Sequence, residues 1–137
     1  MSNETKKDVE RNVLIIDDYF LVRENHKLIF KKIGFNVIEA NNGEEAFEKI
    51  QEAGVEKISL IIVDVLMPVM DGVEFVKKAH EKFDAELPPV FVCSSASDLP
   101  LVKKMASIGI AGFMVKPVDY KLLISKLQRF FPDISYS

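Results

Sequence analysis

Three unbroken apolar runs that each end in a polar residue constrain the fold more than any other feature of this sequence. They are residues 12–17 (NVLIID), 59–64 (SLIIVD) and 89–94 (PVFVCS). Apolar residues in a row, without polar alternation, are typical of strands that are covered on both faces. A carboxylate at the end of such a strand costs free energy unless another group compensates its charge. We therefore expect buried strands whose ends carry functional groups.

Segments of helical length separate these strand candidates from one another and from two shorter ones, residues 36–40 (NVIEA) and 111–115 (AGFMV). Their apolar residues recur at helical spacing. Asn42, with Glu45 three residues later, matches the capping box that begins a helix. The predicted helices are residues 19–33, a helix that begins at Asn42, a helix from residue 71 or 72 to about residue 83, a helix within SASDLPLVKKMASI that stops at Gly109, and a helix from Asp119 to Pro132. Regular alternation of strand and helix predicts a parallel sheet with helices on both faces.

Length and composition indicate one globular domain. The chain has 137 residues, of which 48% are hydrophobic and 28% are charged, and these are ordinary values for such a domain. We expect residues 1–11 to form a flexible N-terminal extension, residues 12–132 the domain, and residues 133–137 a short tail. Met1 and a helix that ends near the C-terminus favour a stand-alone protein over a piece of a longer one.

Charge and cysteine content limit the partners and the compartment. A net charge of −3 gives no electrostatic reason to expect nucleic acid or an anionic membrane as the main partner. The single cysteine, Cys93, excludes an internal disulfide and fits a reducing compartment. The polar N-terminus lacks a signal-peptide core, and no apolar run approaches about 18 residues. We therefore expect a cytoplasmic protein without a membrane span.

Polar residues follow four of the predicted strands, and parallel strands bring such residues to one edge of the sheet. They are Asp17, Asp18, Asp64, Ser94 and Lys116. Two carboxylates about 4 Å apart repel by on the order of 4 kcal/mol at an effective dielectric constant near 20, so a cation is expected among them. Mg²⁺ prefers oxygen ligands and often shares a phosphate oxygen. Asp64 is placed to be the nucleophile, because carboxylates can form aspartyl-phosphates.

Four signals together resemble the receiver domain of response regulators. They are the acidic doublet at residues 17–18, the segment DVLMPVMDG at 64–72, the serine that ends the fourth strand, and the Lys-Pro pair at 116–117. The resemblance covers about residues 12–131. It implies an α/β, flavodoxin-like, doubly wound five-stranded parallel sheet of order 2-1-3-4-5 with five helices.

The same resemblance implies the chemistry of the site. Asp64 would accept a phosphoryl group from a phosphohistidine of a partner, either a histidine kinase or a phosphotransfer protein. The implied Mg²⁺ ligands are Asp17, Asp18, Asp64 and the backbone carbonyl of Leu66. Lys116 would contact the phosphoryl group, and the bond from Lys116 to Pro117 is often cis in this family.

The resemblance also implies how the signal would leave the site. Ser94 would swing toward the phosphoryl group, and the rotamer of Phe113 would follow it, although Phe113 alone also suits a core position. The surface formed by the fourth helix, the fifth strand and the fifth helix would then change its affinity for a downstream protein target. We therefore predict a phosphorylation-dependent switch of a two-component phosphorelay, not an enzyme.

Two other classes of function are alternatives. Small phosphohydrolases with an aspartate nucleophile carry an Asp-x-Asp pair on the first strand and a cap domain, whereas the doublet here is adjacent and the nucleophile is on the third strand. Flavin-binding electron carriers of the same fold bind phosphate at the first strand-to-helix turn, where residues 15–22 (IIDDYFLV) would repel it. Turnover of a phosphate ester, or a coloured purified protein, would favour one of these classes.

Several residues outside the site have simpler interpretations. Cys93 lies within an apolar strand and is expected to be an inert core residue. His26 and His80 are expected at the surface of their helices. Asp71 and Gly72 are expected to form a turn and a helix start, with Gly72 permitting a tight approach of the chain.

Overall fold

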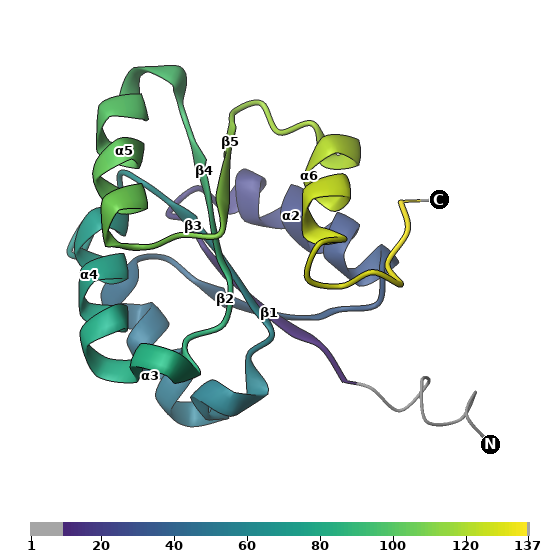
Figure 1. Cartoon of the computed structure of the whole chain (residues 1–137), viewed down its shortest axis with the longest axis horizontal. Helices are drawn as coiled ribbons and strands as arrows, with labels where there is room; N and C mark the ends of the chain where they lie inside the picture. Colours follow the sequence, from purple (N-terminus) through teal and green to yellow (C-terminus); the bar gives the residue numbers. More distant parts are fainter. Residues whose placement is uncertain (1–9, 137) are drawn as a thin grey trace.

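A five-stranded parallel sheet forms the centre of the computed structural model, which describes residues 10–136 (Figure 1). The strands are β1 (Asn12–Ile16), β2 (Asn36–Ala40), β3 (Leu60–Asp64), β4 (Val90–Ser94) and β5 (Gly112–Val115). Their order is β2-β1-β3-β4-β5, and every neighbouring pair is parallel. The predicted sheet, including its strand order, is confirmed.

Five helices alternate with the strands, as predicted: four connect successive strands and the fifth follows β5. They are α2 (Phe20–Lys32), α3 (Gly43–Ala53), α4 (Gly72–Phe83), α5 (Leu99–Ile108) and α6 (Tyr120–Leu127). Three one-turn 3-10 helices, η1 (Val55–Lys57), η2 (Asp84–Glu86) and η3 (Ala96–Asp98), lie in the connections.

The last helix is shorter than predicted. It ends at Leu127, not at Pro132, because the chain tightens into turns in which Phe130 N and Phe131 N both donate to Leu127 O. These turns let Phe130 pack edge-to-face on Phe91 and Phe131 pack edge-to-face on Phe35. Aromatic packing therefore decides the end of α6.

Side-chain caps fix the starts of three helices, α3, α4 and α6, the last through Asp119. At α3, Asn42 Oδ1 accepts a hydrogen bond from Glu45 N at 2.9 Å, as the predicted capping box requires. The Glu45 carboxylate accepts in return from Asn41 N at 2.7 Å, one residue before the expected partner. At α4, Asp71 Oδ1 accepts from Glu74 N at 2.9 Å, so Asp71 is the helix-start residue that the sequence predicts.

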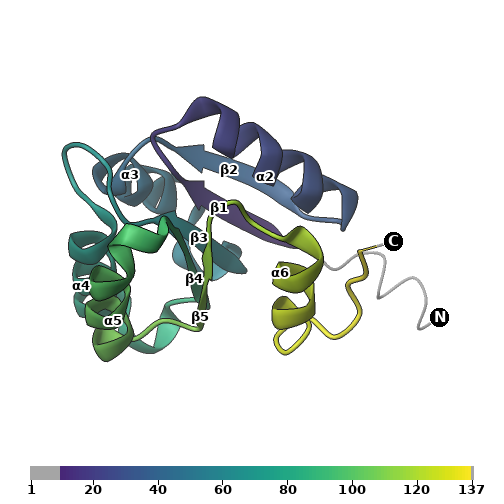
Figure 2. The ribbon, with the colours of Figure 1, turned by 90° about the horizontal axis from the view of Figure 1, so that it is seen from above.

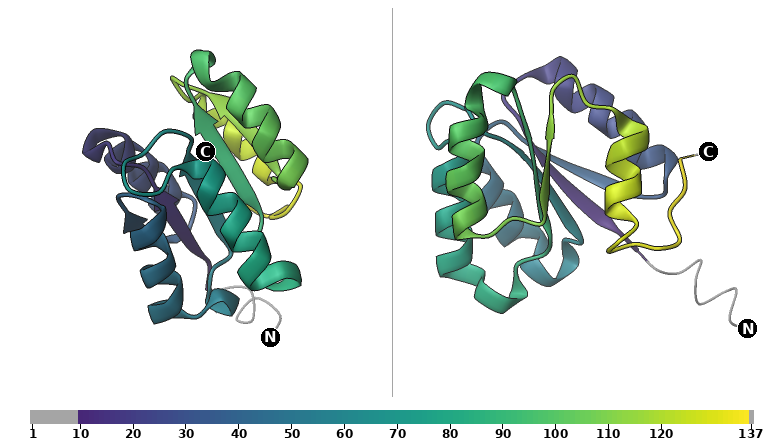
Figure 3. Two further views of the ribbon diagram at one scale, coloured as in Figure 1. Left: turned by 90° about the vertical axis from the view of Figure 1, so that its left-hand side faces the viewer. Right: turned by 45° about the horizontal axis from the view of Figure 1, so that its top comes forward.

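Helices cover both faces of the sheet and divide the core into two clusters. Figure 2 shows α2 and α6 on one face and α3, α4 and α5 on the other, and Figure 3 shows the same layers from two further sides. One cluster joins sheet residues such as Val63 to Phe75 of α4 and Met105 of α5. The other joins Ile15 and Cys93 to helices α2 and α6. Cys93 is 1% exposed and burial raises the pKa of its thiol to about 12, in keeping with an inert core residue.

The prediction that both histidines lie at the surface is wrong for His26. His26 is 1% exposed, because it points from α2 toward α6 and hydrogen-bonds to Tyr120 there. His80 is half-buried, and its Nε2 lies 2.7 Å from the carbonyl oxygen of Gly109. Each ring contacts a hydrogen-bond partner that is distant in the sequence.

Contacts of the chain ends extend beyond the predicted domain limits of residues 12 and 132. The Arg11 guanidinium makes two hydrogen bonds to the Asp133 carboxylate, at 2.6 and 2.9 Å. Ile134 is buried in the cluster beneath α2 and α6. Residues 1–9 of the predicted flexible extension lie outside the described residues. Within residues 10–136, no helix is long and apolar enough to cross a membrane.

Candidate functional site

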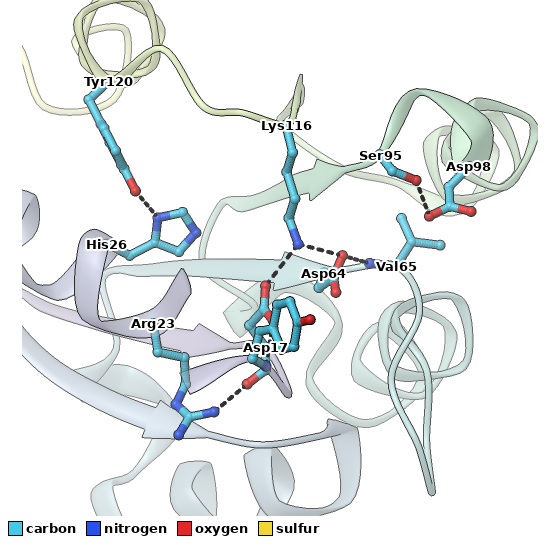
Figure 4. A network of polar contacts seen from close by, with 10 residues as sticks. Asp17, Arg23, His26, Asp64, Val65, Ser95, Asp98, Lys116 and Tyr120 are labelled. Atoms are coloured by element: carbon cyan, nitrogen blue, oxygen red, sulfur yellow. Dashed lines mark hydrogen bonds and ion pairs between the residues drawn. The ribbon is translucent and has the colours of Figure 1, made fainter. Parts of the chain in front are cut away.

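The ends of the parallel strands bring the predicted polar residues to one edge of the sheet, and Figure 4 shows Asp17, Asp64 and Lys116 of this group. Asp17 directly follows β1, Asp64 is the last residue of β3, Ser94 is the last residue of β4, and Lys116 directly follows β5. The backbone continues the sheet geometry into this edge, because Lys116 N donates to Ser94 O at 2.7 Å. Residues almost 100 positions apart in the sequence therefore share one site.

Three carboxylates form the acidic part of the site. One oxygen each of Asp17, Asp18 and Asp64 lies within 4.8 Å of the others. Asp17 is 2% exposed and Asp64 is 9% exposed, whereas Asp18 is exposed to solvent. Oxygen donors this close together, open to water on one side, fit a hard divalent cation that keeps part of its hydration shell, as Mg²⁺ does.

Lys116 supplies the positive charge of the site. Its Nζ lies 3.1 Å from Asp17 Oδ2 and 3.2 Å from Asp64 Oδ1. Partial burial acts to lower the pKa of the ammonium, but the two carboxylates outweigh it and the pKa is raised. Lys116 is therefore charged at neutral pH and bridges the first and third strands.

Asp64 combines burial with a defined orientation. Its Oδ1 accepts hydrogen bonds from Val65 N, at 2.8 Å, and from Lys116. Burial first, and the neighbouring Asp17 carboxylate second, raise the pKa of Asp64 to about 6, against the opposing effect of Lys116. The ionised form of this carboxyl group is therefore unfavourable, and a bound cation or a covalent modification would reduce its free-energy cost.

The close approach of α4 holds the end of β3 in place. A Cβ atom at Gly72 would overlap the backbone carbonyl oxygen of Asp64, so only glycine fits there. Gly72 N donates to Val65 O at 2.7 Å, which completes the contact. The predicted tight approach at Gly72 is confirmed.

Ser94 and Phe113 differ in their surroundings. Ser94 is fully buried, and its Oγ has no hydrogen-bond partner among residues 10–136. Phe113 is 39% exposed, so its ring is not a core side chain, and Lys126 Nζ lies 5.7 Å from the ring centre. Phe113 pairs with Val92, two residues before Ser94, in the register of β4 and β5. The Leu66 side chain is 53% exposed, two residues after Asp64.

The sequence did not point to three residues that support the site. Arg23, on α2, donates from Nη1 to Asp17 O at 2.7 Å (Figure 4) and from Nε to Glu39 at 3.2 Å. His26 and Tyr120 form a part-buried hydrogen bond behind the site. Charged and aromatic residues on amphipathic helices are common, so their types and spacing gave no signal.

Comparison with known proteins agrees with this geometry. The response regulator receiver domain family matches residues 13–128. The chemotaxis protein CheY of Thermotoga maritima is 32% identical over 87% of this chain and 96% of its own length. A structure from Borrelia burgdorferi, the CheX–CheY–BeF₃–Mg²⁺ complex, is 31% identical, covers 93% of both chains and superposes with a TM-score of 0.81.

Several relatives are longer than this chain. A cyclic di-GMP phosphodiesterase of Thermotoga maritima is 39% identical over 84% of this chain, which spans only 29% of that protein. The chain spans 57% and 51% of two further curated relatives. The family match nonetheless extends over nearly all of the described residues. The structure also has the strand order and the strand-end residues that the sequence resemblance implies. The chain belongs to the response regulator receiver domain family, the phosphorylation-dependent switches of two-component signalling.

Proposed function

We propose that a phosphoryl group from a phosphohistidine of a partner is transferred to Asp64, and that Mg²⁺ binds between Asp17, Asp18 and Asp64. The observation that carries the proposal is the arrangement of Asp64 itself. Its carboxylate lies within 4.8 Å of two others and 3.2 Å from the Lys116 ammonium. The proposed donor is a histidine kinase or a phosphotransfer protein, and the proposed compartment is the cytoplasm.

The residues of the chain divide the work of this transfer. Val65 N–H and Lys116 hold Asp64 Oδ1 and so fix the direction of the carboxylate. A carboxylate oxygen forms the new bond to phosphorus as the phosphorus–nitrogen bond to the donor imidazole breaks, and the bonding electron pair leaves with that nitrogen. Lys116 offsets negative charge on the phosphoryl oxygens.

Mg²⁺ would be held by Asp17, Asp18, Asp64 and the Leu66 carbonyl. When bound, it supplies a positive charge that offsets the repulsion among the carboxylates and the phosphoryl oxygens. Arg23 supports the ligand Asp17 through its backbone carbonyl. Asp18 is exposed to solvent, so water molecules would supply the remaining ligands of the ion on that side.

The proposed output begins at Ser94. An aspartyl-phosphate adds a charge of roughly −1.5 to −2 next to this side chain, by analogy with other phosphorylated residues. The buried Ser94 hydroxyl has no partner among the described residues, so it is available to bond a phosphoryl oxygen. Its movement would shift β5 and Phe113 and thereby the surface made by α5, β5 and α6, which we propose binds a downstream protein.

Phosphorylation by acetyl phosphate with Mg²⁺ tests the proposal. We expect one phosphoryl group per chain, mapped to Asp64 by peptide mass spectrometry. Asp64→Asn should abolish its incorporation. Asp71→Asn is the matched control, since Asn can replace Asp as the cap of α4, and it should be phosphorylated like the unaltered chain. Equal incorporation into Asp64→Asn would refute the assignment.

A further inference from the structure

A part-buried hydrogen bond joins α2 to the start of α6 behind the site. His26 Nδ1 lies 2.8 Å from the hydroxyl oxygen of Tyr120, and the two rings meet edge-to-face with centres 5.7 Å apart. Figure 4 shows the Tyr120 hydroxyl directed at the His26 ring. Tyr120 is the first residue of α6, four residues after Lys116.

Both partners are neutral at neutral pH. Burial, and then the charge of Lys116, lower the pKa of His26 to about 4. Burial is the main cause that raises the pKa of Tyr120 to about 12. His26 Nε2 is buried and has no hydrogen-bond partner within residues 10–136. A buried polar atom left unpaired is destabilising, so an apolar side chain would fill this position at lower cost. We therefore expect the hydrogen bond at Nδ1 to have a role other than core packing.

The same two chain segments are also joined at the site itself. Lys116 Nζ contacts Asp17 Oδ2 at 3.1 Å, and His26 contacts Tyr120, so segments 17–26 and 116–120 are connected at both ends. Asp119, between these contacts, caps α6 by accepting from Leu122 N at 3.1 Å. Only three residues separate Lys116 from Tyr120, so we expect a displacement of Tyr120 to be passed on to Lys116.

We propose that the His26–Tyr120 hydrogen bond is a positioning pair for Lys116. It seats segment 116–120 on α2 and keeps the ammonium within reach of both Asp17 and Asp64. The inference rests on the proposed function, because it assigns the pair a part in phosphoryl transfer to Asp64. Neither residue contacts the phosphoryl group, so their effect passes through Lys116.

Removing the Tyr120 hydroxyl tests this role with little change in packing. In the full chain, with acetyl phosphate and saturating Mg²⁺, Tyr120→Phe should slow phosphorylation by ~3- to 10-fold, the usual scale of coupling between neighbouring residues. Tyr136→Phe is the matched control, since that ring is 39% exposed and lies over Lys32. It should leave the rate unchanged. His26→Leu should slow the rate like Tyr120→Phe, and the double variant should be no slower than either.

A second background separates positioning from loss of stability. Tyr120→Phe should lower the thermal midpoint equally in the unaltered chain and in Lys116→Met. It should slow phosphorylation only where Lys116 is present. The reaction is followed for hours so that slow variants are quantified. Equal slowing in both backgrounds, or none in either, would overturn the inference alone. If the unaltered chain takes up no phosphoryl group, the proposed function fails and this inference fails with it.

Discussion

At the scale of single residues, Asp64 carries the most unfavourable charge of the site. Burial and the Asp17 carboxylate both disfavour its ionised form, and Lys116 with the Val65 amide only partly compensates. A carboxyl group whose pKa is raised on folding stabilises the fold fully at pH values below its unfolded pKa. That contribution is lost as the pH rises through the folded value. Without metal, the fold should therefore lose stability as the pH rises through about 6.

The Val65 amide gives a direct measure of this titration, because its N–H donates to Asp64 Oδ1. We expect the amide nitrogen and proton shifts of Val65 to titrate with a midpoint near pH 6 in metal-free protein. Mg²⁺ binds the ionised carboxylate, so it should move the midpoint to lower pH. The measurement is a pH series of heteronuclear NMR spectra with and without Mg²⁺. A metal-free midpoint near the ordinary value of 3.8, or one that ignores Mg²⁺, would contradict this account.

At the scale of elements, α2 shows what periodicity could and could not predict. Its position and length follow from the spacing of its apolar residues, but Leu21 and Leu28 are 71% and 70% exposed. These two lie on the outer side, whereas Phe30 and His26, four residues apart, share the inner side. The burial of His26 depends on Tyr120, 94 residues away, and no local pattern carries that information.

The surface proposed to bind a downstream protein is formed by α5, β5 and α6. β5 is an edge strand, and Phe113 lies partly exposed on it beneath the Lys126 ammonium. Its backbone is paired to β4 on one side only, so a movement at the end of β4 reaches this surface directly. α3 covers the same face of the sheet as α5, but near the opposite edge, so it supplies a comparison.

Beryllofluoride, a phosphoryl mimic, tests this surface in the presence of Mg²⁺. We expect backbone amide shifts to change more across α5, β5 and α6 than across α3, because the signal passes from Ser94 into the adjacent strand. Phe113→Ala should reduce the changes in α5 and α6 and leave those near Asp64 in place. Changes confined to the strand ends, or as large in α3 as in α6, would count against the proposed output surface.

At the scale of the whole molecule, the sheet is the device that assembles the site. Asp17, Asp64 and Lys116 lie far apart in the sequence, and parallel strands in the order β1-β3-β4-β5 bring their ends together. This convergence could be predicted, because each residue directly follows or ends a recognisable apolar run. The link from Arg23 to the Asp17 carbonyl and the early end of α6 could not, because both depend on contacts made only after folding.

A metal ion bound by these carboxylates would also affect the stability of the entire domain. The carboxylates repel one another in the folded state and are dispersed in the unfolded chain, so a bound cation stabilises the fold as well as the site. We therefore expect Mg²⁺ to bind between the ends of β1 and β3.

Calorimetric titration measures the binding of Mg²⁺ at this site. The unaltered chain should bind one Mg²⁺, and Asp18→Asn should weaken the affinity by at least ~10-fold, the lower end of the range found even for outer-shell partners of a metal. Asp71→Asn, the cap of α4, should bind like the unaltered chain. Unchanged affinity in Asp18→Asn, or no binding to the unaltered chain, would contradict the account.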